Sequence, residues 1–464
     1  MKLYDVIIIG GGPGGSTAAT FLAQKGHSVL VIEKEKFPRE HIGESLIPLT
    51  FAVLNKLGLI EDLKKMAPRK PGVNFVDSDG KRQSLWCFKN VIEDKSYLTF
   101  HVVRSAFDKL LLDNSRKNGA EVLEQTMVKN VIIDSPDGIV KVHTTGATQN
   151  QEIFHSKFII DASGQSTFLG SKLGVKKSYD DLDRVAVFSH WTNTNFDTIL
   201  KEGAIKIIYL GGEKKGWVWV IPISSEHLSI GIVVNNDFVK KEKHRLTENG
   251  SSDWKTDLYN QELFNSPAMK TILEGATMNH KVQIIGDYSY HCEKKYGDNY
   301  AMIGDAGAFL DPIFSSGIHV AMHSAWLVSD AIHIKLTGGN AEEAMAVVYK
   351  EINGALNLLE KFIRLFYTPE AMNFATIEQN ENLLFEKFEM AYQIFHFLLA
   401  GDFFKNYEKY SGFIDMVTDK NTLVKYQNFI KYPMRKNLDS RCDESFVEMY
   451  GEMTHKVEFD HTTW

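Results

Sequence analysis

The chain has 464 residues, and its content of 44% hydrophobic and 24% charged residues is ordinary for a protein with a packed core. This length allows about two or three domains, or one large enzyme with an inserted subdomain. The net charge of −7 argues against a nucleic-acid-binding surface, and no apolar run approaches the roughly 20 residues that cross a bilayer. We therefore expect neither bound nucleic acid nor a transmembrane segment.

The three cysteines, Cys87, Cys292 and Cys442, lie far apart in the sequence. An odd number of cysteines with this spacing fits neither a disulfide framework nor a zinc site. The pattern predicts a reducing, cytoplasmic setting and no bound metal.

The N-terminal residues predict a nucleotide site. Residues 4–9, YDVIII, are typical of a buried parallel strand, and Gly10, Gly12 and Gly15 follow it with G-x-G-x-x-G spacing before a predicted helix. These glycines permit a tight turn, the approach of a pyrophosphate, and close packing of helix and strand. A second strand ends at Glu33, whose carboxylate can accept hydrogen bonds from the adenosine ribose. This segment alone leaves both NAD and FAD open.

Segments further along the chain favour FAD. Residues 37–46, FPREHIGESL, could line the isoalloxazine, and Asp305 in I-G-D-A-G is placed to hold the ribityl chain. Arg104 begins an amphipathic helix and could equally be a surface arginine. We find no second glycine fingerprint for NAD(P)H. The candidate cofactor-binding residues are Gly10, Gly12, Gly14, Gly15, Glu33, Lys34, Arg39, Ser45, Arg104, Asp305, Pro312, Gly317 and Ile318.

These widely separated segments resemble the FAD-dependent monooxygenase superfamily of the hydroxybenzoate hydroxylase type. The resemblance implies an α/β fold with a discontinuous, Rossmann-like FAD-binding domain at 1–72, 100–180 and 280–335. Alternating polar and apolar residues predict an antiparallel β-sheet substrate domain at 73–99 and 181–279. Helical periodicity with many aromatic residues predicts a helical C-terminal cap at 336–464, in which we assign no residue a chemical role.

Residues 217–222, WVWVIP, fit W-x-W-x-I-P and resemble the flavin-dependent halogenases, a branch of the same superfamily. Two aromatic side chains on one face of a strand usually pack into a core. In a halogenase they imply a barrier between the flavin and the organic substrate, which only hypohalous acid made from chloride or bromide can pass. The candidate tunnel and barrier residues are Trp217, Trp219, Pro222, Phe309 and Phe314.

The resemblance also implies a catalytic lysine. Residues 70–75, KPGVNF, fit the K-x-G-x-x-F pattern of the phenol-type branch, so Lys70 would guide hypohalous acid by forming a chloramine or a hydrogen bond. An ammonium is a compact donor whose pKa shifts readily on burial. Lys64, Lys65 and Arg69 are nearby rivals, and an exposed lysine is the usual case.

A halide site is expected at Ser316 and Gly317. The family pattern F-x-x-P-x-x-S-x-G fits residues 309–317, directly before a predicted helix whose first N–H groups could hold an anion. A plain helix cap with serine at the N-cap explains the same residues.

The substrate is expected to be an electron-rich aromatic. Tryptophan halogenases carry a glutamate two residues before the halide-binding Ser or Thr, where this chain has Phe314. That departure favours a phenol or pyrrole, free or tethered to a carrier protein, over free tryptophan. FADH2 would come from a separate NADH:flavin reductase. An aromatic hydroxylase, a prenyl-chain reductase and a flavoprotein without turnover are the alternatives.

Overall fold

The computed structural model describes residues 2–192, 203–286, 289–368, 373–375, 389–418 and 442. Its first sheet has eight strands, five of which follow the order β20-β10-β1-β2-β7 with all four neighbouring pairs parallel. The residues of β1 from Val6 to Ile8 are completely buried, as expected for a strand covered on both faces. These strands are β1 (Leu3–Ile9), β2 (Val29–Ile32), β7 (Glu121–Leu123), β10 (Gln151–Asp161) and β20 (Tyr300–Met302).

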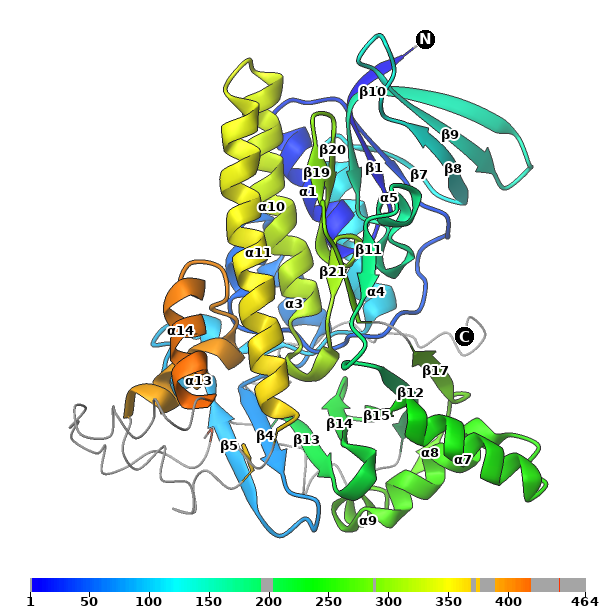
Figure 1. Ribbon diagram of the computed structural model, residues 1–464, viewed down its shortest axis with the longest axis vertical. Helices are drawn as coiled ribbons and strands as arrows, with labels where there is room; N and C mark the ends of the chain where they lie inside the picture. Colours follow the sequence, from blue (N-terminus) through cyan, green and yellow to red (C-terminus); the bar gives the residue numbers. More distant parts are fainter. Residues whose placement is uncertain are drawn as a thin grey trace.

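Helices cover this sheet, and antiparallel strands extend it. Helix α1 packs against both α4 and α10, and α11 packs against α10, as Figure 1 shows. Strands β8 and β9 form an antiparallel arm on β10, and β19 pairs with β20. The bounds are α1 (Pro13–Gln24), α4 (Arg104–Lys117), α10 (Gly317–Leu336), α11 (Ala341–Phe366), β8 (Thr126–Ile132), β9 (Val140–Gly146) and β19 (Tyr296–Gly297).

A second sheet has the order β16-β12-β15-β14-β13-β4-β5, with β17 also paired to β12. All its strand pairs are antiparallel except β13 with β4, which is parallel. The sequence analysis expected an antiparallel sheet throughout, so this one pair differs from the expectation. Helices α7, α8 and α9 lie against its outer side (Figure 1). The bounds are β4 (Gly72–Val76), β5 (Gln83–Cys87), β12 (Arg184–Thr192), β13 (Ile205–Leu210), β14 (Gly216–Pro222), β15 (His227–Asn235), β16 (Thr277–Met278), β17 (Gln283–Gly286), α7 (Asn236–Glu248), α8 (Trp254–Asn265) and α9 (Pro267–Ile272).

Strand alternation gives the second sheet two apolar faces. Val218 and Val220 pack with α8 and α9, whereas Trp217, Trp219 and Ile221 join the core shared with the first sheet and α11. The predicted period of two therefore holds in β14, and it directs both tryptophans toward the FAD-binding side.

Shorter elements connect the two sheets. Strand β3 pairs with β6, and β11, β18 and β21 form a small sheet. The remaining bounds are α2 (Thr50–Lys56), α3 (Ile60–Met66), α5 (Phe168–Lys172), β3 (Arg69–Lys70), β6 (Thr99–Phe100), β11 (Lys176–Ser178), β18 (Tyr290–Cys292), β21 (Ala308–Phe309), and the 3-10 turns η1 (Phe88–Asn90), η2 (Lys95–Tyr97), η3 (Gly164–Ser166), η4 (Gly212–Lys214), η5 (Gly304–Ala306) and η6 (Pro312–Phe314).

Beyond α11, the described C-terminal elements are α13 (Glu389–Ala400) and α14 (Tyr407–Thr418), and α14 packs on α11. Part of the predicted aromatic stripe and most of the residues after 418 lie outside the described residues. The predicted domain boundaries stay predictions.

The expectation that the cysteines form no disulfide is wrong. Cys87, the last residue of β5, is bonded to Cys442 across 355 residues of sequence. Cys292 is free and buried. Sequence spacing could not reveal this pair because the bond joins two residues that are 355 positions apart. The cysteine pattern therefore no longer argues for a reducing compartment.

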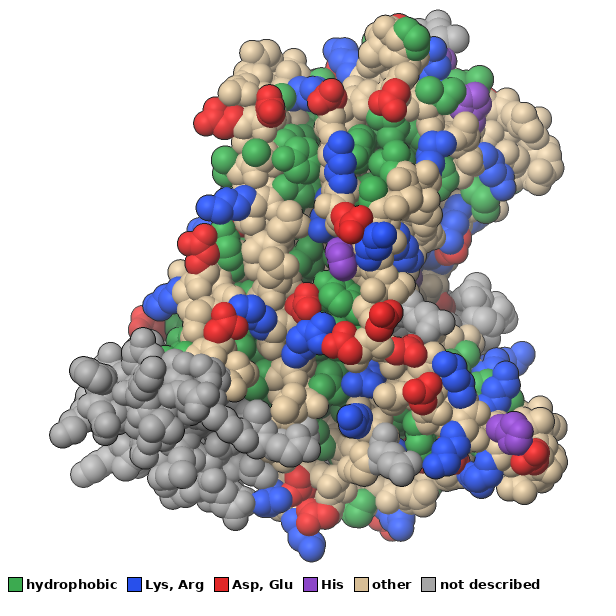
Figure 2. Space-filling view, in the orientation of Figure 1, with side chains coloured by type: hydrophobic (Ala, Val, Ile, Leu, Met, Phe, Trp, Pro, Cys, Tyr) green, Lys and Arg blue, Asp and Glu red, His purple; other side chains and the backbone are tan. Residues whose placement is uncertain are grey.

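The surface agrees with the charge composition. Figure 2 shows basic and acidic side chains interspersed over the face in view, rather than gathered by sign. Among the helices that the structure describes, none is long and apolar enough to cross a membrane.

The substitution Gly15→Ala tests the close packing of the N-terminal glycine turn. A Cβ there would lie 1.9 Å from the carbonyl oxygen of Gly10, which is backbone and cannot rotate away. We expect Gly15→Ala to lower the free energy of unfolding by about 3 kcal/mol or more, and to lower FAD occupancy. Gly412→Ala is the control, because a Cβ there meets open space on α14 and should stabilise by about 0.5–1 kcal/mol. Urea unfolding of both variants checks this, and equal stabilities would contradict it.

Candidate active site

One cavity of about 670 Å³ joins the N-terminal glycine turn to the two tryptophans. It therefore brings together segments that are far apart in the sequence. Among the predicted site residues, its lining includes Gly10, Gly12, Gly14, Glu33, Lys34, Arg39, Ser45, Arg104, Trp217, Trp219, Asp305, Phe309, Pro312, Gly317 and Ile318. Five predicted residues lie outside the lining, namely Gly15, Lys70, Pro222, Phe314 and Ser316.

The Glu33 carboxylate is buried and rigidly held at one end of the cavity. Its Oε2 accepts a hydrogen bond from the Gly11 N–H at 2.7 Å, and its Oε1 accepts one from the Glu35 N–H at 2.9 Å. Each carboxylate oxygen retains a further lone pair, so both can accept hydroxyl groups of a ribose. Lys34 is exposed and lies 3.8 Å from the Glu35 carboxylate.

Two helix N-termini lie at this cavity. Helix α1 begins after Gly12, which has no side-chain cap, and α10 begins after Ser316. Gly12 and Gly14 line the cavity at the start of α1, and Gly317 lines it at the start of α10. Free N–H groups and the helix dipole favour anions at both ends. The α1 end fits a pyrophosphate.

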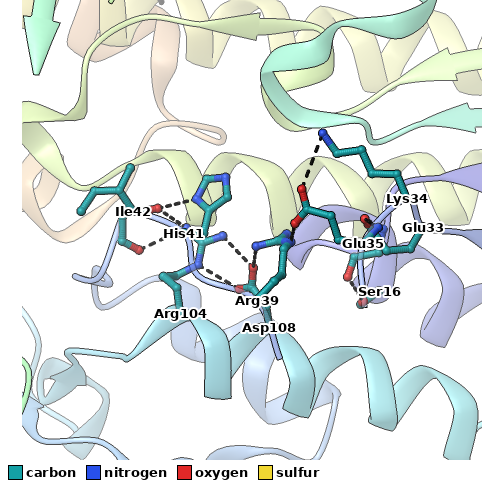
Figure 3. A network of polar contacts seen from close by, with 11 residues as sticks. Ser16, Glu33, Lys34, Glu35, Arg39, His41, Ile42, Arg104 and Asp108 are labelled. Atoms are coloured by element: carbon teal, nitrogen blue, oxygen red, sulfur yellow. Dashed lines mark hydrogen bonds and ion pairs between the residues drawn. The ribbon is translucent and has the colours of Figure 1, made fainter. Parts of the chain in front are cut away.

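Arg39 and Arg104, which line the cavity, share the buried Asp108 behind them in the polar network of Figure 3. Arg104 donates from Nε and Nη2 to the two oxygens of Asp108, at 2.8 and 2.9 Å, and from Nη1 to the carbonyl oxygen of Ile42. Arg39 Nη1 lies 3.1 Å from the same carboxylate. Burial alone would raise the pKa of Asp108, but the two arginines lower it overall. Arg104 is thus buried, which excludes the surface interpretation.

Asp305 and Ser45 provide polar groups without strong partners. Burial raises the pKa of the Asp305 carboxyl to about 7, although Arg104 acts in the opposite direction. The Ser45 hydroxyl is buried at the cavity wall and has no hydrogen-bond partner among the described residues. Together with Glu33 and the α1 N-terminus, these groups fit a dinucleotide such as FAD, which would supply the missing hydrogen-bond partners.

Trp217 and Trp219 line the cavity side by side on β14, and we call this pair the tryptophan wall. Specific contacts hold both side chains. Trp219 Nε1 donates to Ser229 Oγ at 3.1 Å, and Trp217 Nε1 donates to Tyr367 Oη at 2.9 Å. Gly231 faces Trp219 in the strand register, and a Cβ there would lie 2.2 Å from the indole. Glycine at 231 therefore lets the indole lie flat across β15. Pro222 shares the opposite face of β14 with Val218 and Val220, away from the wall.

Lys70 is completely buried on β3. Its Nζ donates to the Leu46 carbonyl oxygen at 2.9 Å and lies 5.6 Å from the Phe88 ring centroid. Burial lowers its pKa to about 7. An ammonium has three donors, so donors remain for a ligand. The Thr99 hydroxyl, which is opposite Lys70 in the register, is buried and without a hydrogen-bond partner among the described residues.

The rival cations near Lys70 have other roles. Arg69 is buried, donates to the Leu98 carbonyl oxygen at 3.0 Å and stacks on Phe100 at 4.5 Å. Lys64 pairs with Glu61 at 3.1 Å, and Lys65 is exposed. Lys70 alone of these four combines full burial with spare donors.

The segment predicted to bind halide forms a sharp turn into α10. Ser315 has a φ of 53°, in the left-handed region that non-glycine residues rarely adopt. Ser316 occupies the N-cap position, as the capping interpretation expects, but makes no side-chain cap hydrogen bond. Phe314 is buried and stacks on Phe362, with ring centroids 3.9 Å apart. This turn carries Gly317 to the cavity and directs Phe314 into the core.

The sequence analysis missed a buried acid–base pair. Glu44 Oε1 lies 2.8 Å from His190 Nε2, and both side chains are no more than 2% exposed. Burial would lower the pKa of His190, but attraction and hydrogen bonding to Glu44 raise it overall. Glu44 lines the cavity, so this pair joins the G-E-S segment to β12. A glutamate inside a matched motif was visible in sequence, whereas its histidine partner, 146 residues away, was not.

Asp108 and Tyr367 were missed as well. Asp108 stands four residues after Arg104 on the predicted helix, so an i,i+4 ion pair could have been found. Tyr367 follows α11, in the region to which we assigned no chemical role. Within the part of the chain that the structure describes, no group of three or more His, Cys, Asp or Glu residues could hold a metal.

The burial of Lys70 predicts a pH-dependent stability. Its pKa is about 7 in the folded chain and about 10.5 when exposed, so between these values the unfolded chain binds one more proton. The free energy of unfolding should therefore rise with pH through this window, by at most about 1.4 kcal/mol per pH unit. Lys70→Met should remove that contribution to the slope, and Lys65→Met, an exposed control, should keep it. Urea unfolding from about pH 7 to 10 measures both, and equal slopes in all three proteins would contradict the prediction.

Known proteins resemble the chain in sequence and in structure. Residues 3–353 match the family described as FAD binding domain. A tryptophan 2-halogenase of Chondromyces crocatus is 32% identical over 72% of this chain and 62% of its own length. A 1H-pyrrole-2-carbonyl peptidyl-carrier-protein brominase of Pseudoalteromonas luteoviolacea is 34% identical over 79% of this chain and 86% of its own length.

A solved structure agrees with these relatives. The flavin-dependent brominase Bmp2 is 31% identical, with a TM-score of 0.73 over 89% of this chain and 98% of that protein. The Rossmann-like sheet, the second β-sheet and the C-terminal helices thus belong to a known architecture. The match with the tryptophan 2-halogenase spans less than two thirds of that relative's length. The chain belongs to the flavin-dependent halogenases within the FAD binding domain family.

Proposed function

We propose that this protein uses FADH2, O2 and chloride or bromide to halogenate an electron-rich aromatic ring. The observation that supports this most strongly is the arrangement around Lys70. Its amine is fully buried with spare donors and lies outside the cavity, which Trp217 and Trp219 line. An aromatic hydroxylase would need the substrate ring beside the flavin. Such an enzyme would not require a buried amine that lies outside the flavin cavity, as Lys70 does.

Bound FADH2 would give two electrons to O2, which would take two more from the halide, so that hypohalous acid and water form. The residues of this chain do the rest. The N–H groups at the start of α10, at Ser316 and Gly317, hold the halide beside the flavin. Trp217 and Trp219, with Phe309 at the cavity, keep the organic substrate from the flavin.

Lys70 holds the hypohalous acid at the far side of the wall. As an ammonium it donates a proton to the departing oxygen, so that the aromatic C–H and HOX give the C–X bond and water. As a neutral amine it forms an N–X bond and releases water, and the ring then takes the halogen. With a pKa of about 7, both forms exist near neutral pH.

A phenol or pyrrole is the proposed substrate class. Phe314 stacks on Phe362, so this position offers no carboxylate that could stabilise positive charge on a less activated ring. A phenol or pyrrole is reactive without it. The pyrrole brominase acts on a ring tethered to a peptidyl-carrier protein, and we propose the same kind of substrate here, with a free phenol as the alternative.

We propose that FADH2 reaches the enzyme from a separate NADH:flavin reductase. A cytoplasmic setting fits this supply of reduced flavin, although the Cys87–Cys442 disulfide removes the argument from the cysteine pattern.

A reconstituted assay tests the whole proposal. The chain, a flavin reductase, NADH and FAD are incubated with phenols and carrier-bound or free pyrroles, with and without chloride or bromide. Mass spectrometry should show halide-dependent halogen isotope patterns. Hydroxylated products without halide dependence would instead establish a hydroxylase.

Lys70→Ala should abolish halogenation and leave FAD binding unchanged, because the amine lies outside the cavity lining. Lys65→Ala is the matched control, since it removes an exposed lysine five residues earlier and should halogenate normally. Product formation by mass spectrometry and FAD binding by absorbance measure the two effects. Normal halogenation by Lys70→Ala would remove Lys70 from the mechanism.

The pH profile should distinguish the two roles of Lys70. If the ammonium acts as a donor, the halogenation rate should fall as pH rises through about 7. If the neutral amine forms an N–X bond, the rate should rise through the same value. Single-turnover rates with pre-reduced FAD measure the halogenation step without the reductase. A flat profile across this range would contradict both roles.

A further inference from the structure

Three side chains from separate elements form a partly buried hydrogen-bonded series that begins at the tryptophan wall. Trp217 Nε1, on β14, donates to Tyr367 Oη at 2.9 Å. Tyr367, directly after α11, donates in turn to Asp311 Oδ2 at 2.9 Å. The direction is fixed, because an indole N–H can only donate and a carboxylate can only accept. The Tyr367 hydroxyl thus uses its donor and one acceptor position at once.

Asp311 also holds the turn that leads to the proposed halide positions. Its Oδ1 accepts the N–H of Ile313 at 3.0 Å, at the start of the segment that continues to Ser315 and Gly317. The Asp311 side chain is 3% exposed, and its hydrogen bond from the Ile313 N–H is buried. One carboxylate therefore connects Tyr367 to the 311–317 turn.

The rings in this series are also held in place. The guanidinium of Arg184, from β12, lies 4.3 Å from the Tyr367 ring centroid. Phe366 meets Trp217 edge-on, with centroids 6.5 Å apart and an interplanar angle of 84°. The C-terminal end of α11 thus contacts the tryptophan wall through both a packed ring and a hydrogen bond.

We propose that Tyr367 is a positioning residue that holds the Trp217 indole and the 311–317 turn in one arrangement. This inference rests on the proposed halogenase function and extends it. With the hydroxyl in place, the wall keeps one shape, and hypohalous acid passes toward Lys70. Without it, the indole N–H and the Asp311 carboxylate lose their shared partner, the indole can turn, and the acid escapes to solvent.

Tyr367→Phe tests the proposal because it removes one oxygen and keeps the ring under Arg184. Tyr349→Phe is the matched control. It lies on α11, the helix that Tyr367 follows, is buried, and donates to the carbonyl oxygen of Met302 at 2.8 Å, away from the wall. Tyr367→Phe loses two hydrogen bonds, with Trp217 and Asp311, and Tyr349→Phe loses one, so the variants are compared by the Trp217 signal rather than by stability.

The first measurement needs no catalysis. Fluorine NMR of fluorotryptophan-labelled protein reports the surroundings of the seven tryptophans, and Trp217→Phe identifies the signal of residue 217. We expect that signal to shift or broaden in Tyr367→Phe and to be unchanged in Tyr349→Phe. An unchanged signal in Tyr367→Phe, or equal changes in both variants, would overturn the proposal.

The second measurement is the yield of halogenated product per FADH2 oxidised, with escaping hypohalous acid trapped by a soluble amine. Tyr367→Phe should lower this yield by about fivefold, the factor for one typical hydrogen bond, and raise the trapped fraction. FADH2 oxidation should keep its rate.

In the Tyr367→Phe background, Asp311→Asn should lower the yield no further, because the connection of Asp311 to Trp217 is already lost. A yield within about twofold of the unmodified protein would overturn the proposal. If the unmodified protein forms no halogenated product, the proposed function fails, and the fluorine signal still decides the role of Tyr367.

Discussion

The alternation of side chains along β14 is the constraint on which the site depends. Both faces of the second sheet are covered, so Trp217 and Trp219 point to the cavity only while Val218 and Val220 point to α8 and α9. A slip of one residue would exchange the two sets and place indoles where small side chains must pack. The register is fixed on both sides of β14, and Gly231 of β15 leaves room for the Trp219 ring. The positions of Trp217 and Trp219 are thus fixed by the strand register of the sheet.

Burial of charge is the second constraint, and the chain meets it in two ways. Asp108 is paired with two arginines, and Glu44 is paired with His190, so these charges have partners in the dry interior. Lys70 donates to a backbone carbonyl, which carries no full charge, and burial lowers its pKa instead. A group that lowers stability in this way is typical of a functional site, because a structural role would be filled better by an apolar side chain.

The sequence predicted the parts of the fold that local pattern determines. The buried strand at β1, the glycine turn, the two-residue period of β14 and the start of α10 all follow from residues that lie close together in the chain. The parallel pairing of β13 with β4, the Cys87–Cys442 bond and the Glu44–His190 pair join residues that lie far apart. Local patterns in a sequence do not show which distant segments meet. Pro222 was placed at the wall for a different reason, because its motif was clear but the alternation that puts it on the opposite face was not considered.

The C-terminal helix α11 contacts the tryptophan wall, which its composition did not suggest. An aromatic stripe is usually core, and α11 does pack its rings into the core, as Phe362 does on Phe314. Its last turn nevertheless ends at the tryptophan wall, where Phe366 packs on Trp217 and Tyr367 bonds to it. Packing and polar contact at one helix end restrict both translation and rotation of the indole, which packing alone would not do. The region to which the sequence analysis assigned no chemical role therefore contacts the most recognisable motif directly.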